Sequence, residues 1–244
     1  MDGQTAVVTG ASRGIGNAVA HAFAEAGAHV VVCARDAEAI REVAAAIEAE
    51  GGEATATRAD VRDEFDVERL METAAGIGNG IDCVVANAAV YHGETGSTPL
   101  TEESYAAFDD HMRTNARGTF ATIREALPHL AADARILVAS GSVAREPYPG
   151  YGSYAVSKAA AEAIARGFGA DTEQVVGVVD PGQVATDLSG GRGHDPADVA
   201  EQFRWAATEA PAELIDGEVL TRKQWRKETR WPRVSPGNRE PPCR

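Results

Sequence analysis

The sequence predicts an α/β protein in which helices cover both faces of a doubly wound parallel sheet. Strand-like runs rich in valine and alanine alternate with helix-like segments along most of the chain. A glycine-rich turn joins the first strand-like run to the first helical segment. This alternation is typical of right-handed βαβ units with a buried parallel sheet. A chain of 244 residues is long enough to build one generous domain around a single core.

Seven short apolar runs are the expected strands, because each has the length and residue types of a buried strand. In chain order they are 5–9, 29–34, 54–59, 81–86, 135–140, 175–179 and 218–220. The helices expected between them are 15–26, 36–50, 64–77, 101–130, 154–169 and 196–208. Asp36 and Asp195 are expected N-caps, Pro196 suits a first helical turn, and Gly51 follows the second helix as a stop signal.

The last stretch of the chain has a different composition from the rest. We expect one dinucleotide-binding and catalytic domain over residues 1–221, followed by a basic, proline-containing tail over residues 222–244. Such a tail is usually flexible, and we expect disorder of at least its last residues. The alternative is that it docks on the acidic body of its own or a neighbouring subunit.

Charge and composition limit the classes of function. The net charge of −14 argues against a nucleic-acid partner, because phosphate binding needs a basic surface. No apolar run is long enough to span a membrane and no secretory signal opens the chain, so we expect a cytoplasmic enzyme. The cysteines are too scattered for a disulfide framework, and the histidines show no ligand spacing, so no metal is expected. An acidic, lysine-poor chain also resembles proteins of salt-loving organisms, the alternative being a GC-rich genome.

The first strand runs into a glycine-rich loop, Thr9-Gly10-Ala11-Ser12-Arg13-Gly14-Ile15-Gly16, and then into a helix. Glycines let the backbone turn tightly and approach a pyrophosphate, while the helix N-terminus presents N–H donors. The loop therefore predicts a dinucleotide phosphate site. Its sequence resembles the start of short-chain dehydrogenase/reductase family members, whose Rossmann-type sheet carries the active site in the same domain.

The end of the second strand bears on the choice of nicotinamide cofactor. In NAD-binding units an acidic residue at this point bonds the ribose 2′-hydroxyl, and the resemblance places Ala34 there, followed by Arg35. Arg35 and Arg13 can pair with a 2′-phosphate, which favours NADP(H). The alternative is that both arginines are solvated surface residues. Asp36 is interpreted as the cap of the next helix.

The resemblance implies further cofactor contacts at the ends of the later strands. Beyond Arg35, the expected cofactor-binding residues are Gly10, Ser12, Arg13, Gly14, Ile15, Gly16, Asp60, Val61, Asn87, Ala88, Tyr154, Lys158, Pro181, Gly182 and Thr186.

Tyr154 and Lys158 are four residues apart, so a helix places the phenol and the ammonium on one face. A nearby cation stabilises phenolate, and we expect it to lower the pKa of Tyr154 toward the working pH. Lys158 is the only lysine in the first 222 residues, which indicates a specific need for an ammonium. The resemblance implies that this pair supplies acid–base catalysis. Tyr148 and Tyr151 have no lysine four residues on and could line a substrate pocket.

The resemblance also implies a catalytic serine after strand 135–140. At the family's usual spacing the position falls on Gly141. Ser142 agrees best with the family pattern because Val143-Ala144 follows it, and this choice requires the loop before Tyr154 to be one residue shorter than usual. Ser140 would instead require an insertion in that loop. Ser142 is therefore chosen, with Ser140 as the alternative, and the other serine is read as a hydroxyl that bonds locally.

Asn115 lies in a segment that closely matches the family's Asn-x-x-Gly-Thr-Phe pattern. The resemblance implies that it holds a water in a proton relay, although a buried asparagine can also simply bond backbone. In the expected reaction Ser142 and Tyr154 donate hydrogen bonds to a carbonyl, hydride passes from the nicotinamide to the carbonyl carbon, and Tyr154 donates the proton. The expected protein is an NADP(H)-dependent oxidoreductase that interconverts a ketone or aldehyde and an alcohol.

Two other functions stay open. A 3-oxoacyl-thioester reductase would need a cationic entrance for its carrier, and the acidic body argues against one. A non-catalytic NADP(H)-binding sensor is supported only by the displaced serine. Residues 189–194 form a short glycine-rich segment where relatives often carry a larger lid, so substrate identity is not predicted. By analogy we expect a homodimer or homotetramer that acts on a small molecule.

Overall fold

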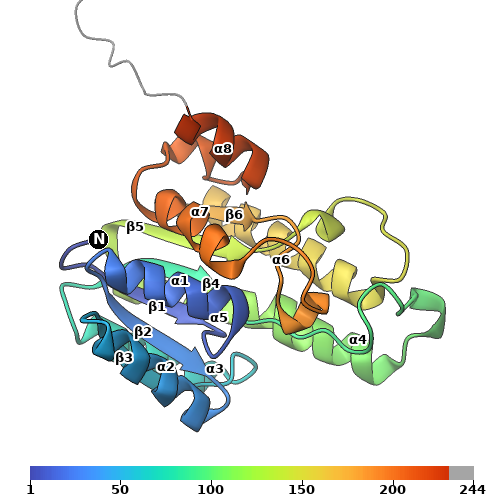
Figure 1. Cartoon of the computed structure of the whole chain (residues 1–244), viewed down its shortest axis with the longest axis horizontal. Coiled ribbons are helices and arrows are strands. Elements are labelled where there is room, and N and C mark those ends of the chain that lie inside the picture. Colours follow the sequence, from blue (N-terminus) through green and yellow to red (C-terminus); the bar gives the residue numbers. More distant parts are fainter. Residues whose placement is uncertain (231–244) are drawn as a thin grey trace, which may run out of the picture.

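The computed structural model describes residues 1–230, and a seven-stranded sheet forms its centre (Figure 1). The strands are β1 (Thr5–Thr9), β2 (His29–Ala34), β3 (Glu53–Arg58), β4 (Ile81–Ala86), β5 (Leu130–Ala139), β6 (Val175–Asp180) and β7 (Val219–Thr221). Their order is β3-β2-β1-β4-β5-β6-β7, and every neighbouring pair is parallel. The predicted fold class is confirmed.

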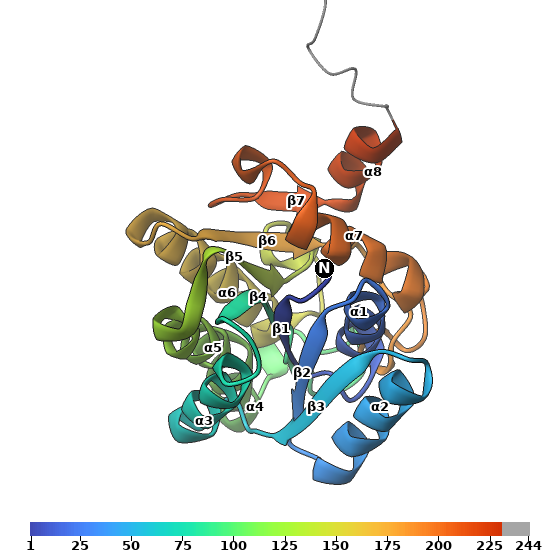
Figure 2. The same ribbon diagram turned by 90° about the vertical axis from the view of Figure 1, so that its left-hand side faces the viewer.

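Helices cover both faces of this sheet (Figure 2). They are α1 (Gly14–Glu25), α2 (Ala37–Ala49), α3 (Glu64–Ala75), α4 (Tyr105–His111), α5 (Gly118–Ala126), α6 (Gly152–Asp171), α7 (Pro196–Thr208) and α8 (Arg222–Arg230). Side chains alternate across a strand, so Val8 of β1 packs in one core with Phe23 and Phe203, while the adjacent Val7 packs in the other with Leu70. These two cores fix the strand register, because a one-residue slip would exchange the two faces.

From β1 the chain continues through β2 to β3 at one edge of the sheet, and from β4 it continues through β5 and β6 to β7 at the other edge. The strand order therefore reverses between β1 and β4. The carboxyl ends of all seven parallel strands lie along one edge. In open α/β sheets ligands bind in the crevice at such a reversal point. The loops that follow β1 and β4 are therefore the natural walls of a binding site.

Two predicted helix starts agree with the structure. The Asp36 side chain accepts hydrogen bonds from the N–H groups of Glu38 and Ala39, and that of Asp195 accepts one from Ala197. Each carboxylate satisfies N–H groups that have no partner within the helix.

The helix predicted over residues 101–130 is present as one helical stretch over residues 105–126, but its predicted ends were wrong. A 3₁₀ turn (Leu100–Glu102), α4, a π-helical turn (Met112–Arg117), α5 and a second 3₁₀ turn (Leu127–His129) follow one another, and β5 begins at Leu130. The Ser104 side chain caps α4 at Ala107, which separates α4 from the first turn. The second turn contains Pro128, which lacks the N–H that would continue a helix.

The basic tail predicted from residue 222 begins with helix α8. Trp225 of α8 packs against the core on the α1 and α7 side of the sheet. The disorder expected for the last residues falls at positions 231–244, which lie outside the described residues. Over residues 1–230 the structure contains no helix with the length and apolar character needed to cross a membrane.

Candidate active site

A cleft of about 1040 Å³ opens at the carboxyl edge of the sheet, between the loops that follow β1, β2, β3, β4 and β6. The predicted cofactor-binding residues that line it are Gly10, Ser12, Arg13, Gly14, Ile15, Arg35, Asp60, Val61, Asn87, Ala88 and Thr186. The other predicted residues, Gly16, Pro181, Gly182, Tyr154 and Lys158, lie outside its lining. Most of the predicted cofactor-binding residues, although they come from five separate loops, therefore line one cavity.

Close backbone packing explains two of the loop glycines. Gly10 has a φ of +66°, and a Cβ there would lie 2.7 Å from the Cα of Ala88. A Cβ on Gly16 would lie 2.5 Å from the amide nitrogen of Asn87 and 2.5 Å from the Gly10 carbonyl. The Asn87 amide also donates to the carbonyl of Thr9, at 2.9 Å. Gly16 therefore serves the packing of the loop on β4, which explains its absence from the cleft wall.

The N-terminus of α1 opens at this cleft without a side-chain cap. The Arg13 side chain occupies the N-cap position but makes no capping hydrogen bond, and no acidic residue stands in the first turn. The N–H groups of this turn, together with the helix dipole, form a site where an anion is stabilised.

The end of β2 carries a positive charge and no competing carboxylate at Ala34. Arg35 is exposed on the cleft wall. The Asp36 carboxylate accepts hydrogen bonds from α2 at 3.0 and 3.2 Å, so its charge is directed into that helix. This part of the cleft can therefore hold a second anionic group beside Arg35.

Asp60 and Val61, after β3, have partners that the sequence did not reveal. The Arg62 side chain holds the Asp60 carboxylate through Nε at 3.0 Å to each oxygen, and this hydrogen bonding lowers the pKa of Asp60. Arg62 also donates to Asp110, before the π-helical turn. Val61 packs on Gly118, where a Cβ would come within 2.7 Å of its methyl group.

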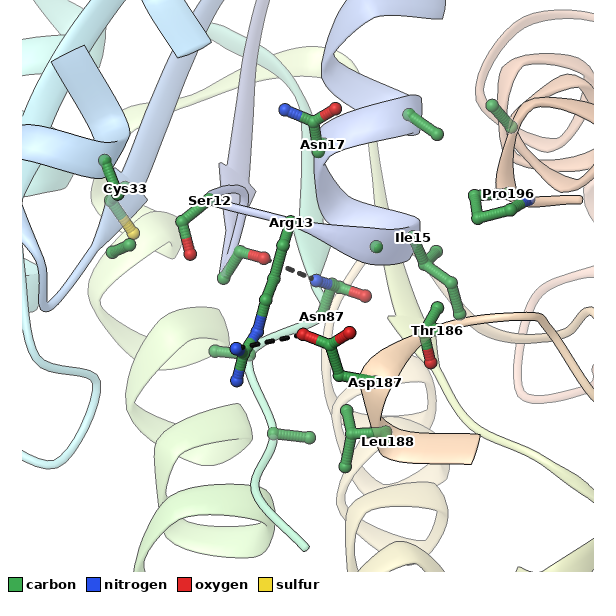
Figure 3. Close-up of a pocket in the computed structure, with 18 of the residues that line it drawn as sticks. Ser12, Arg13, Ile15, Asn17, Cys33, Asn87, Thr186, Asp187, Leu188 and Pro196 are labelled. Carbon is green, nitrogen blue, oxygen red and sulfur yellow. Dashed lines mark hydrogen bonds and ion pairs between the residues drawn. The ribbon is translucent and has the colours of Figure 1, made fainter. Parts of the chain in front are cut away.

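An ion pair crosses the mouth of the cleft (Figure 3). Arg13 of the glycine loop lies 3.1 Å from Asp187, which follows Thr186 on the far wall, and both side chains are about three-quarters exposed (75% and 76%). Asp187 was not among the predicted residues, because nothing in its local sequence points to a partner in the first loop.

Tyr154 and Lys158 both lie on α6, four residues apart, as predicted. The Lys158 ammonium is buried, donates to the carbonyl of Ala139 at 2.9 Å and lies 5.9 Å from the centre of the Tyr154 ring. Burial lowers the pKa of Lys158 to about 8, and the nearby Glu162 carboxylate opposes that shift.

The expected lowering of the Tyr154 pKa was wrong for this structure. Burial first, and then the neighbouring phenols of Tyr151 and Tyr91, raise the pKa of Tyr154. The Tyr91 ring packs edge-on against Tyr154 with centroids 4.9 Å apart. The Lys158 ammonium is directed at a backbone carbonyl, so it does not outweigh these effects. Tyr154 is held as a neutral phenol, which can donate a proton.

The two candidate serines have different surroundings. Ser140 donates from Oγ to the buried carboxylate of Glu162 at 2.7 Å. Ser142 begins a 3₁₀ turn (Ser142–Ala144) and makes only a longer contact, 3.3 Å from its Oγ to the hydroxyl of Tyr148. The Ser140 hydroxyl is therefore committed to the protein interior, whereas that of Ser142 can turn to another acceptor.

Asn115 lies in the π-helical turn and joins three segments. Its side chain accepts from the N–H of Val90 at 2.8 Å and donates to the Val90 carbonyl at 3.0 Å and to Ser157 Oγ at 2.9 Å. It thus ties the end of β4 to α6, one residue before Lys158. Single π-helical turns occur frequently at functional sites. The water relay expected at Asn115 stays a prediction.

A buried carboxylate caps the helix that carries Tyr154. Tyr151 gives α6 no side-chain cap, but Glu103 accepts from the N–H of Ser153 and from its Oγ, both at 2.5 Å. His111 Nδ1 lies 2.6 Å from the same Oγ. The Glu103 side chain is only 6% exposed, so these contacts replace its hydration. Sequence reasoning missed this clamp because its members are about fifty residues apart.

A second buried charge cluster is centred on Arg145 and includes Glu162, one helical turn after Lys158 on α6. Arg145 donates to both Glu162 on α6 and Asp180 at the end of β6, whose side chains are 2% and 7% exposed. Asp180 also accepts from the N–H of Gly182 at 2.9 Å. Arg145 therefore fixes the predicted Pro181-Gly182 segment relative to α6. No local pattern identifies this cluster.

Comparisons with known proteins agree with one family. A family profile described as short chain dehydrogenase matches residues 4–197. The chain is 38% identical over 194 residues to the short chain dehydrogenase/reductase AacuN of Aspergillus aculeatus, covering 77% of this chain and 72% of the relative. It is 37% identical over 195 residues to a probable tetrahydroxynaphthalene reductase of Zymoseptoria tritici, covering 77% and 71%.

Two solved structures show the same architecture. A short chain dehydrogenase from Burkholderia cenocepacia in complex with NADP superposes with a TM-score of 0.80 at 29% identity, covering 90% of this chain and 96% of that one. A 7α-hydroxysteroid dehydrogenase complexed with NADH and 7-oxo glycochenodeoxycholic acid superposes with a TM-score of 0.82 at 27% identity, covering 91% and 94%.

Proposed function

Because this chain belongs to the short-chain dehydrogenase/reductase family of oxidoreductases, we propose that it is an NADP(H)-dependent enzyme interconverting a ketone or aldehyde and an alcohol. The observation that carries the proposal is the position of Tyr154 and Lys158 on one face of α6, tied through Ser157 and Asn115 to the end of β4. A neutral phenol beside a buried ammonium is an arrangement suited to proton transfer.

The cleft fits a dinucleotide. Two glycines of the loop allow close packing at the cleft: a Cβ on Gly10 would lie 2.7 Å from the Ala88 Cα, and one on Gly14 would lie 3.0 Å from the Thr186 methyl group. The uncapped first turn of α1 suits a pyrophosphate. Residues of the glycine loop would hold the phosphates, Asp60, Val61 and Asn87 the adenosine half, and Lys158, Pro181, Gly182 and Thr186 the nicotinamide half.

NADP(H) is preferred over NAD(H) because of the charges at the end of β2. Arg35 is exposed there, Ala34 offers no carboxylate to a 2′-hydroxyl, and Asp36 is engaged in capping α2. A 2′-phosphate beside Arg35 and Arg13 gains charge-assisted hydrogen bonds that a 2′-hydroxyl cannot make. The NADP complex of the Burkholderia relative is consistent with this choice, whereas the hydroxysteroid dehydrogenase complex contains NADH.

The bound nicotinamide supplies hydride chemistry, and the protein residues polarise and protonate the substrate. In our proposal Ser142 Oγ and the Tyr154 hydroxyl donate hydrogen bonds to the substrate carbonyl. Tyr154 then gives its proton to the developing alkoxide. The buried Lys158 ammonium stabilises the phenolate that remains, and Asn115 keeps α6 in register with β4. In the reverse direction the same groups remove a proton from an alcohol.

The test is a panel of carbonyl substrates, with oxidation of NADPH and of NADH followed by absorbance at low and high salt. Turnover with NADPH and a clear preference for NADPH over NADH are expected. Tight NADPH binding without turnover across the panel would favour a sensor, and turnover confined to acyl thioesters would favour a 3-oxoacyl-thioester reductase. Turnover that prefers NADH would overturn the cofactor assignment.

A further inference from the structure

Helix α8 gathers positive charge on an otherwise acidic protein. Four cationic side chains on this helix and His194 surround a cavity of about 440 Å³. We call the four side chains the α8 cluster, which consists of Arg222, Lys223, Arg226 and Lys227. The whole chain has 37 acidic residues against 23 lysines and arginines, so cations here would be expected to find carboxylates easily.

The α8 cluster nevertheless has no carboxylate partner within residues 1–230: none of its members joins an ion pair there. The Arg222 side chain contacts the Asp198 backbone carbonyl at 3.3 Å, and its guanidinium carbon lies 5.5 Å from the centre of the Trp225 ring. Neither contact neutralises its charge.

Arg222 gives the independent sign of a ligand, because it is buried and incompletely satisfied. Only 9% of the residue is exposed, and its Nε has no hydrogen-bond partner among the described residues. The indole nitrogen of Trp225, on the same helix, is also buried without a partner there. Burial and the charge of Arg226 lower the pKa of Arg222, partly opposed by Asp198. The Asp198 charge offsets only part of the cost of burying this cation, and an anion in the cavity would offset the remainder.

The cavity adjoins the catalytic end of the sheet. Thr221, the last residue of β7, is in register with Asp180 of β6, so α8 starts beside the Pro181-Gly182 segment. His194 bonds through its backbone to Gln183 and Ala185, both at 2.8 Å, and Ala185 lines the large cleft. One strip of chain, residues 183–194, therefore separates the two cavities.

The 2′-phosphate of the proposed cofactor is not the group expected at this cavity. Arg35 follows β2, and four strands lie between β2 and β7 (Figure 2). At about 4.8 Å per strand the two positions are roughly 24 Å apart. The proposed pyrophosphate site is the first turn of α1, in the large cleft, and no residue of the glycine loop lines the α8 cavity. The anion is therefore assigned to another molecule or to a substrate placed at the catalytic end.

We propose that the α8 cluster and His194 form a binding site for a multivalent oxyanion of the phosphate class, separate from the cofactor cleft. The anion either belongs to a phosphate-bearing substrate whose reacting carbonyl reaches Tyr154, or is a free phosphate compound. Guanidinium and ammonium groups from one helix face, with a buried Arg222 behind them, match the several oxygens of such a ligand.

The probe is inorganic pyrophosphate, titrated by calorimetry into the full chain saturated with NADP⁺ at constant ionic strength. Saturation with NADP⁺ blocks the glycine loop, where pyrophosphate could otherwise bind. The variant is Lys223→Gln with Arg226→Gln, since both side chains are exposed and join no ion pair within residues 1–230. The matched control is Arg41→Gln with Arg166→Gln, two exposed arginines far from α8 in the sequence.

We expect saturable binding that weakens by about tenfold or more in the α8 variant and stays unchanged in the control variant. Absence of saturable binding, or equal weakening in both variants, would overturn the proposal. Steady-state kinetics then identify the source of the anion. The α8 variant and the unmodified protein are compared on two substrates that share one keto group, one with and one without a phosphate-bearing tail. A rise in KM for the phosphate-bearing form alone assigns the site to the substrate. Unchanged kinetics with weakened pyrophosphate binding assigns it to a free phosphate compound.

Discussion

The cofactor side and the catalytic side of the active-site edge are stabilised by different interactions. Along β1 and β4, backbone packs on backbone, and Gly10 and Gly16 are required because a Cβ would meet main-chain or amide atoms within 2.7 Å. Along β5, β6 and α6, buried carboxylates hold the elements together: Glu103 caps α6, and Arg145 links Glu162 to Asp180. The first side tolerates few changes in residue size, and the second tolerates few changes in charge.

This difference suggests that each side should respond to its own kind of substitution. A change of volume should harm cofactor binding on the cofactor side and leave the catalytic side unaffected. Loss of a charge should reduce stability on the catalytic side. The following changes test that contrast.

The largest effect on stability is expected for Arg145→Met. This change leaves the carboxylates of Glu162 and Asp180 buried without their shared cation, and breaking such a cluster costs about 3 kcal/mol in the free energy of unfolding. Urea unfolding measures the loss. Arg117→Met is the control, because the Arg117 side chain pairs with the exposed Glu64 and donates to the Arg62 carbonyl on the surface, so its loss should reduce stability much less. Equal losses in the two variants would contradict the contrast.

On the cofactor side, Gly10→Ala is expected to weaken NADPH binding by about 2 kcal/mol, or about 30-fold in Kd, because the new methyl group meets the Cα of Ala88. Gly3→Ala is a close control: its φ of +69° matches the +66° of Gly10, but nothing lies within 4 Å of its Cβ. The control should lose about 1 kcal/mol of stability through backbone strain and keep its NADPH affinity. A fluorescence titration with NADPH compares them.

The sequence predicted the cofactor side better than the catalytic side, for a physical reason. Close packing and tight turns in the loop require glycine, so Gly10, Gly14 and Gly16 make the loop recognisable within a few residues of sequence. Tyr154 and Lys158 were equally visible because their spacing matches one helical turn. The clamp around Glu103 joins residues about fifty positions apart, and such pairs leave no local pattern.

Two segments differ from their predictions for different reasons. The helix expected over 101–130 begins only after the cap at Ser104, and it contains a π-helical turn around Asn115 that its sequence did not indicate. Helix α8 was not predicted, because the proline-containing basic composition of the tail is typical of flexible segments, yet Trp225 packs it on the core. The Ser104 cap is a local signal, whereas at α8 a tertiary contact outweighed the local composition.

A pH profile tests the buried ammonium on the catalytic side. The folded-state pKa of Lys158 is about 8, below its ordinary value of 10.5, so the unfolded chain binds more protons between these values. Stability conferred by this group should therefore rise with pH across that window, and Lys158→Met should lose the rise. Carbonyl reduction should fall above pH of about 8 as the ammonium deprotonates. Reduction that stays constant to pH 10 would contradict a requirement for the charged form.

The smallest effect is expected for Asp187→Asn at the mouth of the cleft. Its ion pair with Arg13 is about three-quarters exposed, so its loss should change stability by about 0.5 kcal/mol or less. Release of Arg13 should tighten NADPH binding by about twofold and leave NADH binding unchanged, and the gain should vanish at high salt. Tighter binding of both cofactors would show that Arg13 does not act on the 2′-phosphate.

The central claim is that Tyr154 supplies the proton on the catalytic side while the cofactor side binds NADPH independently. The most direct measurement compares turnover and NADPH affinity in Tyr154→Phe and in Tyr151→Phe, a second tyrosine whose ring packs against Tyr91. We predict that Tyr154→Phe loses about 10²- to 10⁴-fold in carbonyl reduction with unchanged NADPH affinity, and that Tyr151→Phe keeps most of its activity. Near-normal turnover in Tyr154→Phe would contradict the account.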